Sequence, residues 1–222
     1  MKENLKEKRK LEIIKDKEKR KEEVIRAAIK VIRYHSIEDV KMTQIAEAAG
    51  VGVASVYRYF KTKLELALEA GNWLWNEEIH KMYVEPENAS FNAFNGAQKV
   101  EYFLKVFLKI YKEYPEFFVF LEQFDNYLVK EHVEVERLEQ YEQAINRIKD
   151  TMLTAIEEGK RDGSIRVDLD SQIFYMTTTH SLMSLSQKLI MRGNLLQSDQ
   201  VVSGEEQLET MIQMSMCYIK RP

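Results

Sequence analysis

The sequence is poor in the residues that interrupt helices and in those that bind metals. Its 222 residues include only 8 Gly, 3 Pro, 4 His and a single Cys. One Cys cannot form a disulfide within the chain, which favours a reducing compartment, so we expect a cytoplasmic protein. The longest apolar run, Phe117 to Leu121, is far shorter than the ~20 residues that cross a bilayer. The basic N-terminus has no apolar stretch behind it, so we expect neither a signal peptide nor a membrane partner.

The side chains that carry out catalysis or bind metals lack the spacing that such sites need. The histidines are His35, His80, His132 and His180, and none has a second His or a Cys at metal-ligand spacing. There is no glycine-rich phosphate loop. Cys217 lies in a Met-rich terminal segment and is more typical of a small core residue than of a nucleophile. We therefore expect no catalytic residues, no metal site, no cofactor and no enzyme activity.

What is present is a regular helical pattern. Apolar residues make up 45% of the chain and charged residues 31%, the balance of a folded globular protein. Apolar side chains recur every three or four residues over most of the sequence, which is the period of an amphipathic helix. The predicted helices span residues 24–35, 43–49, 53–59, 63–83, 100–114, 115–129, 133–159, 171–191 and 205–219.

Charge is distributed unevenly along the chain. Residues 1–63 hold 17 basic and 10 acidic side chains, whereas the remainder holds 16 basic and 26 acidic ones. A positive head on a negative body suggests a polyanionic partner at one end only. Within the head, residues 1–23 read as a charged, protruding extension of the first helix, which either adds phosphate or minor-groove contacts or is a solvated Lys/Glu helix.

Residues 43–60 predict two short helices joined by a tight turn. The Thr43 hydroxyl is expected to cap the first of them, and Gly50 can adopt the positive φ that the turn requires. Val56 and Phe60 should point inward from the second helix. The expected buried face of the first helix is formed by Ile45, Ala46 and Ala49. This is a helix-turn-helix, whose second helix enters the major groove of DNA.

The amino-acid sequence of this segment resembles that of a known protein family. Thr43-Gln-Ile-Ala-Glu-Ala-Ala-Gly-Val51, then Ser55-Val-Tyr-Arg-Tyr-Phe60 and Lys63-Leu-Glu-Leu66, is similar to the DNA-binding domain of TetR/AcrR-type transcriptional repressors. The rest of the chain matches this family only in its length, in its helical pattern and in the short segment 158–164. Two positions depart from the family pattern. Ser36 stands where a Gly is common, and Gly52 stands where Ser or Thr often caps the recognition helix.

The resemblance implies an all-α fold with two parts. Residues 24–69 would form an N-terminal three-helix helix-turn-helix domain, and residues 70–222 a larger helical domain for ligand binding and dimerisation. In such proteins a homodimer, formed here through the last two helices, places two recognition helices in successive major grooves of an approximately palindromic operator. The expected partners are therefore double-stranded DNA, a second copy of the chain and a small-molecule effector.

The resemblance also implies which residues contact DNA. Tyr57 and Tyr59 would offer hydroxyls to phosphate, although either could instead be a packing residue. Arg58 reads a base or clamps a phosphate, and Lys63 either meets phosphate or pairs with a nearby glutamate. The full expected set is Thr43, Gln44, Gly52, Val53, Ala54, Ser55, Tyr57, Arg58, Tyr59 and Lys63.

Aromatic residues crowd the stretch 102–127. Large aromatic and Met side chains can line an adaptable apolar cavity, but they can equally be ordinary core. Glu122 and Asp125 lie among them and would favour a cationic ligand if they faced the cavity, or would simply lie on an exposed helix face. The candidate ligand-binding residues are Phe103, Phe107, Tyr111, Phe118, Phe124, Tyr127, Met176, His180 and Met183.

The sequence therefore favours a ligand-responsive transcriptional regulator. The resemblance implies a repressor, although no residue pattern decides between a repressor and an activator. The effector would release DNA by favouring a spacing between the heads that no longer fits the operator. The alternative is an all-helical interaction protein whose helix-turn-helix no longer binds DNA.

Overall fold

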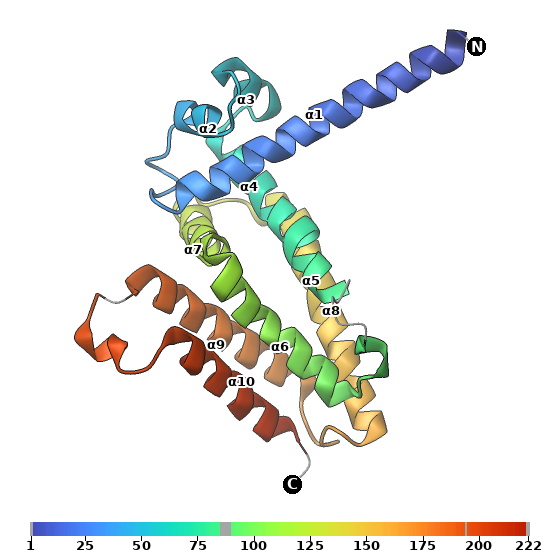
Figure 1. The fold of residues 1–222 in the computed structure, drawn as a ribbon, viewed down its shortest axis with the longest axis vertical. Helices are drawn as coiled ribbons and strands as arrows, with labels where there is room; N and C mark the ends of the chain where they lie inside the picture. Colours follow the sequence, from blue (N-terminus) through green and yellow to red (C-terminus); the bar gives the residue numbers. More distant parts are fainter. Residues whose placement is uncertain (1, 85–89, 194, 221–222) are drawn as a thin grey trace.

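The computed structural model describes residues 2–84, 90–193 and 195–220, and over these residues the fold is all α-helical (Figure 1). The helices of the head are α1 Lys2–Ile32, α2 Met42–Ala48, α3 Val53–Tyr59 and α4 Lys63–Trp73. The remaining helices are the π-helical segment η1 Leu74–Ile79, α5 His80–Val84, α6 Gly96–Glu113, α7 Pro115–Lys130, α8 Glu139–Asp162, α9 Ser171–Arg192 and α10 Gly204–Ile219. Short 3-10 turns are η2 Phe91–Ala93, η3 Val135–Leu138 and η4 Gln197–Gln200.

Helix α1 separates the helix-turn-helix from the body. In Figure 1, α2 and α3 lie on one side of α1, and α6, α7 and α8 lie on the other. From Val24 onward α1 buries an apolar face, whereas residues 7–20 are exposed along their whole length. The apolar pattern that begins at Val24 in the sequence therefore marks the point where α1 meets the rest of the protein.

The start of α2 differs from the prediction. The helix begins at Met42, and Lys41 rather than Thr43 occupies the N-cap position. The Thr43 hydroxyl does not cap the helix. Instead, the Gln44 side-chain oxygen accepts a hydrogen bond from the Lys41 backbone N–H at 2.7 Å. The prediction was wrong because the side chain of Gln44, three residues after the N-cap residue, forms the capping hydrogen bond at this end of the helix.

The long helix predicted over residues 63–83 is present, but its middle is wound differently. The continuous rod consists of α4, η1 and α5, with π-type hydrogen bonding over Leu74–Ile79. Thr62 caps its start, because its hydroxyl accepts from the Glu65 N–H at 3.1 Å. The Glu65 carboxylate in turn accepts from the Lys61 N–H at 2.8 Å, which completes the cap.

Two helices of the body begin at residues other than those predicted. Helix α6 starts at Gly96 rather than at residue 100, because Asn95 and Gln98 form a capping box. Helix α8 starts at Glu139 rather than at residue 133, since His132 adopts a φ of 48° and η3 follows it. Of the loop expected over residues 86–95, residues 86–89 lie outside the described ranges and the rest contains η2.

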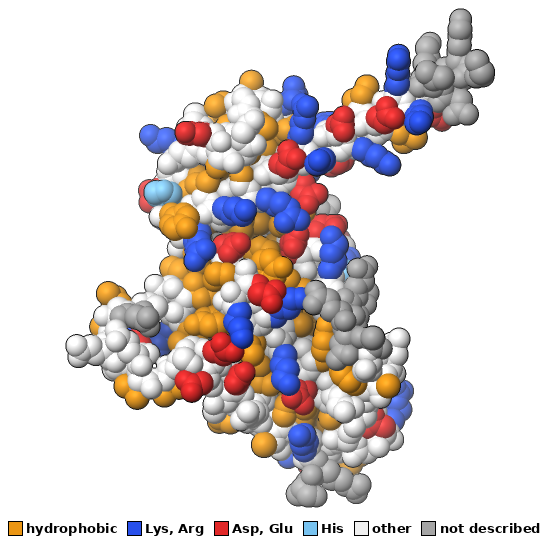
Figure 2. Space-filling model, viewed as in Figure 1, with side chains coloured by type: hydrophobic (Ala, Val, Ile, Leu, Met, Phe, Trp, Pro, Cys, Tyr) orange, Lys and Arg blue, Asp and Glu red, His pale blue; other side chains and the backbone are white. Residues whose placement is uncertain are grey.

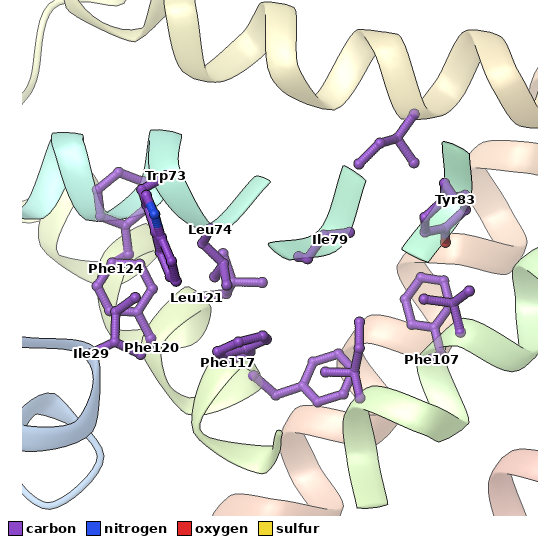
Figure 3. Close-up of a cluster of buried hydrophobic side chains, with 14 of the residues drawn as sticks. Ile29, Trp73, Leu74, Ile79, Tyr83, Phe107, Phe117, Phe120, Leu121 and Phe124 are labelled. Atoms are coloured by element: carbon purple, nitrogen blue, oxygen red, sulfur yellow. The ribbon is translucent and has the colours of Figure 1, made fainter. Parts of the chain in front are cut away.

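The buried side chains of head and body form one continuous core. It extends from Val24 and Ile29 on α1, through the α4 rod, to Leu208 and Ile219 on α10. Figure 3 shows Ile29 of α1 beside Trp73, Phe120 and Phe124, so a head helix packs directly on aromatic residues of α7. The head is therefore seated on the body through apolar contact and not through a polar linker.

Helices α9 and α10 lie side by side at one face of the body (Figure 1). Several apolar residues of these two helices face inward and pack within the chain: Phe174, Leu182, Leu208, Ile212 and Met216. Other apolar residues of these helices are exposed: Ile173, Met176, Met214 and Tyr218. Cys217 is exposed as well, so its reading as a core residue was wrong.

Candidate nucleic-acid interface

The turn between α2 and α3 has the geometry expected of a helix-turn-helix. Gly50 adopts a φ of 65°, as predicted, which places it in the left-handed region. The Gly50 N–H donates to the Glu47 carbonyl at 3.1 Å, and the Val51 N–H donates to the Ala46 carbonyl at 3.0 Å. These bonds end α2 and redirect the chain within a few residues.

Helix α3 is fixed to the head along one face only. Gly52 is its N-cap, as predicted, and the Gly52 carbonyl accepts from the Ser55 N–H at 2.8 Å. Val56 has no exposed surface and Phe60 is 1% exposed, so these two residues anchor the helix. The opposite face, with Tyr57 at 51% exposure, is open to solvent.

The residues expected to contact DNA lie together around this open face. Seven of them are exposed: Thr43, Gln44, Gly52, Val53, Ala54, Tyr57 and Arg58. Ser55 and Tyr59 are half-buried, and both contact Arg58. The Arg58 guanidinium donates to the Ser55 hydroxyl at 3.4 Å and lies 5.4 Å from the centre of the Tyr59 ring. Helix α3 contains no acidic residue, so hydroxyl and guanidinium donors face solvent without a competing carboxylate.

Lys63 lies at the edge of this surface and contacts a carbonyl. Its ammonium donates to the Glu38 backbone oxygen at 2.5 Å, not to Glu65 or Glu69. Glu69 is paired instead with Lys21 at 2.9 Å. Glu38 also bonds Lys130 at the end of α7, at 2.9 Å, and this hydrogen bond lowers the pKa of the Glu38 carboxyl. Glu38 thus links the recognition head to a helix of the body.

Sequence reasoning missed some polar residues at the rim of the interface. Lys41, Lys61 and Thr62 are exposed beside α2 and α3. The Thr62-x-x-Glu65 pattern is a capping-box signature, which could have placed the start of α4 beforehand. The two lysines follow from no motif, but they add positive charge next to the open face.

The aromatic candidates of the body are packed against one another. Phe103, Phe107, Phe118, Phe124 and Tyr127 are buried, and Tyr111 is half-buried. The Phe107 and Phe118 rings stack with centroids 6.4 Å apart, and the rings of Tyr83 and Phe103 stack at 5.2 Å. These side chains occupy the interior, where they form much of the core of the body.

Of the later candidates, Met183 packs against the core that contains these aromatic side chains, whereas the other two lie at the surface. Met176 and His180 are exposed on α9, and Met183 is half-buried. Asp125 is exposed on α7, whereas Glu122 is half-buried and burial raises the pKa of its carboxyl. Within the described residues, buried polar atoms without a hydrogen-bond partner include Asn72 Oδ1, Trp73 Nε1, His80 Nδ1 and Glu122 Oε2.

The described residues contain neither a membrane-spanning helix nor a metal-binding cluster. In the described part of the chain, no helix combines the length and apolarity needed to cross a bilayer. Over the same residues, no group of three or more His, Cys, Asp or Glu side chains is arranged to hold a metal ion.

A three-helix head with an open α3 defines the class, a DNA-binding regulator with a helix-turn-helix. Residues 24–70 match the family model described as bacterial regulatory proteins, tetR family. The head is therefore similar in sequence to the N-terminal domain of that family. A search of curated proteins found no match.

Solved structures agree with the fold over most of the chain. A TetR transcription regulator from Haloarcula marismortui has a TM-score of 0.70 at 18% identity, covering 92% of this chain and 100% of that one. The fatty acid degradation regulator FadR from Bacillus halodurans has a TM-score of 0.66 at 15% identity, and the match covers 89% of this chain and 94% of that one. FadR from Bacillus subtilis, solved in complex with stearoyl-CoA, has a TM-score of 0.64 at 17% identity, and the match covers 89% of this chain and 98% of that one. At these identities the likeness concerns the fold.

Proposed function

We propose that the protein is a ligand-responsive repressor that binds a palindromic operator as a homodimer in the cytoplasm and acts by binding rather than by catalysis. The observation that carries this proposal is α3 itself. Its inner face is anchored by Val56 and Phe60, its outer face presents Tyr57 and Arg58 to solvent, and the helix itself contains no acidic residue. This is the form of a helix that enters the major groove.

The proposed division of the chain follows from the same arrangement. Residues 1–23 are an extension, residues 24–69 are the DNA-binding domain, and residues 70–222 bind the effector and the second subunit. In the head, Tyr57 and Lys63 would hold phosphates and Arg58 would read a base edge or a phosphate. The half-buried Ser55 and Tyr59 would orient the Arg58 guanidinium, since both contact it.

The proposed dimer surface is the exposed side of α9 and α10. A hollow of about 440 Å³ lies between these helices, and Ile173, Met214 and Tyr218 are among the residues that line it. Exposed apolar side chains around a hollow are suited to a self-complementary contact across a two-fold axis. We expect Met214→Glu to convert the dimer to a monomer in sedimentation experiments. The matched control Val129→Glu, at an exposed apolar residue of α7, should remain dimeric.

The proposed effector site lies in the body, close to the rod that joins it to the head. This rod contains the π-helical segment Leu74–Ile79, and such segments are frequent at functional sites. Polar atoms without a partner on the rod and on α7, such as His80 Nδ1 and Glu122 Oε2, could bind a ligand's polar groups. A mostly apolar effector would suit the aromatic interior around them.

An effector acts only through its different affinity for the two arrangements of the heads. To shift the protein from a mostly DNA-binding population to a mostly non-binding one, the effector must bind the second arrangement about 5.5 kcal/mol more tightly than the first. Because a structural neighbour holds stearoyl-CoA, this compound is a first probe. Binding should raise the melting temperature and weaken the DNA complex. If stearoyl-CoA does neither, long-chain acyl-CoA is not the effector class.

Selection of duplexes from a random DNA library tests the DNA-binding proposal. We expect the selected sequences to converge on an inverted repeat. Arg58→Ala should relax selection at one position by about 1–3 kcal/mol if Arg58 reads a base, and Tyr57→Ala should weaken all duplexes alike. Tyr34→Ala, at a tyrosine that is 75% exposed on the same head, serves as the matched control. If no duplex is retained even at low salt, the interaction-protein alternative stands instead.

A further inference from the structure

We propose that the exposed part of α1, residues 7–20, is a rigid arm that lies along the sugar-phosphate backbone beside the operator. Its contacts are made by Arg9, Lys10, Lys17 and Arg20. The inference rests on the proposed DNA-binding function but concerns a surface outside the helix-turn-helix.

The arm is a continuous part of α1 and not a separate segment. Helix α1 runs without interruption from Lys2 to Ile32, and it contains neither Gly nor Pro. Residues 7–20 are exposed throughout, and Figure 2 shows their charged side chains on the part of the helix that projects from the head, whereas Val24 and Ala28 in the same helix have no exposed surface. The buried part of the helix therefore holds the arm in one direction relative to the head.

Charge on the arm is separated onto two halves of the helix. With successive side chains about 100° apart, an arc of roughly half the circumference carries no acidic residue between positions 7 and 20. This basic half contains Arg9, Lys10, Ile13, Ile14, Lys17 and Arg20. The other, mixed half contains Glu7, Lys8, Leu11, Glu12, Lys15, Asp16, Glu18 and Lys19. Four positive charges thus lie on one side, and the other side is close to neutral.

The mixed half faces the body, and the basic half faces away from it. Further along α1, Arg26 projects from the centre of the mixed half, and Arg33 follows directly after the helix ends at Ile32. Arg26 bonds Glu78 of η1 at 2.5 Å, and Arg33 lies 3.9 Å from Glu116 of α7. Both partners belong to elements on the body side of α1, and the contact of Arg26, which lies within the helix, directs the mixed half toward the body.

The basic half lies on the side where DNA must be bound. Lys21 projects from the same half as Lys10 and Lys17, and its ammonium lies 5.8 Å from the centre of the Phe60 ring, at the end of α3. In Figure 1, α2 and α3 lie on the side of α1 away from the body, and the free part of α1 extends past them. A duplex held by α3 would therefore run beside this half of the arm.

The cations of the basic half are available for a partner. In the described ranges, Arg9, Lys10, Lys17 and Arg20 take part in no side-chain hydrogen bond or ion pair, whereas Lys21 and Arg26 are paired with glutamates of α4 and η1. Unpaired cations at helical spacing suit the regular phosphates of a duplex. A helical protein partner would instead require a sustained apolar seam, and between positions 7 and 20 only Leu11, Ile13 and Ile14 are large and apolar.

The test compares two charge-matched variants of the full chain on a duplex selected by the parent protein. The first replaces Lys10, Lys17 and Arg20 of the basic half with Gln, and the second replaces Lys8, Lys15 and Lys19 of the mixed half with Gln. Both lose three charges at exposed positions of one helix. The measurements are the dependence of affinity on salt concentration and the length of the footprint on DNA.

For the basic-half variant we expect a slope of log K against log salt that is shallower by up to about 2.7 for each protomer, which corresponds to three lost phosphate contacts. The footprint should shorten at both outer ends while the two half-sites stay protected. The mixed-half variant should keep the parent's footprint and most of its slope. Equal effects of the two variants, or no effect of the basic-half variant, would overturn the proposal that the arm contacts DNA. A parent that binds no duplex would overturn the DNA-binding proposal, and the arm with it.

Discussion

The head and the body of this protein differ in where their candidate functional residues lie. In the head, mostly aliphatic side chains form the core together with Phe60, and the residues expected to contact DNA lie on the surface of α2 and α3. In the body, the aromatic candidates are themselves the core. A surface that must match a rigid duplex leaves a sharp sequence motif. An interior must only be apolar and well filled, which many sequences can achieve.

The largest expected effect tests whether the aromatic candidates are structural. Phe124 has no exposed surface, and its ring lies 5.6 Å from Phe120 and 5.1 Å from Tyr141. Phe124→Ala should lower the free energy of unfolding by about 3–5 kcal/mol, measured by chemical denaturation at fixed protein concentration. Met176→Ala, at an exposed candidate of α9, should change it by less than about 0.5 kcal/mol. A loss below about 1 kcal/mol for Phe124→Ala would indicate a cavity at this site in place of a filled core.

The second effect concerns the close approach of two helices in the body. A Cβ at Gly96 would lie 2.0 Å from the backbone N of Gly159 in α8, and the backbone cannot yield as a flexible side chain can. Gly96→Ala should therefore cost about 3 kcal/mol in thermal or chemical unfolding. At Gly52 in the head a Cβ meets nothing within 4 Å, so Gly52→Ala should cost only about 1 kcal/mol, from weaker capping. Similar losses at the two positions would contradict this account.

The third effect concerns the turn of the head. Gly50 has a φ of 65°, and a side chain in the left-handed region costs about 1–2 kcal/mol. Gly50→Ala should destabilise the protein by this amount and weaken DNA binding, since α3 depends on the turn for its orientation. Gly50→Asn is the control, because Asn tolerates this conformation better. Equal stability of the two variants would show that the φ of this residue is not the cause.

The smallest effect is a gain in stability. Burial raises the pKa of Glu122, so the folded state holds its proton more tightly than the unfolded state does. The resulting destabilisation is absent below the ordinary carboxyl pKa and is fully present once the pH exceeds the raised value. Glu122→Gln should therefore stabilise the protein at pH 7 and have little effect at pH 4. A gain of equal size at both values would point to packing rather than to ionisation.

Local signals allowed much of the head to be predicted from the sequence. The bounds of α3, the positive φ of Gly50 and the cap at Gly52 agree with the expectation, because each depends on residues within one turn. The cap of α2 was wrong because two polar residues, Thr43 and Gln44, compete for the same end of the helix.

Features that depend on packing between helices could not be predicted. Nothing in the apolar spacing of residues 63–83 distinguishes the π-helical turn of η1 from ordinary helix. Spacing also fails to separate residues that line a cavity from residues that fill a core, as Phe103 and Phe107 illustrate. The division of charge on α1 is different, because it is visible in the sequence but acquires a direction only once Arg26 and Arg33 are seen to reach the body.

The continuous core has a consequence for how the molecule loses its structure. Because Ile29 of α1 packs against Phe120 and Phe124 of α7, separating the head from the body would expose apolar surface of both to water. A fragment that ended near residue 70 would present these contact surfaces to water and be prone to aggregation. Calorimetry of the intact chain should accordingly show a single cooperative endotherm, with both lobes melting together.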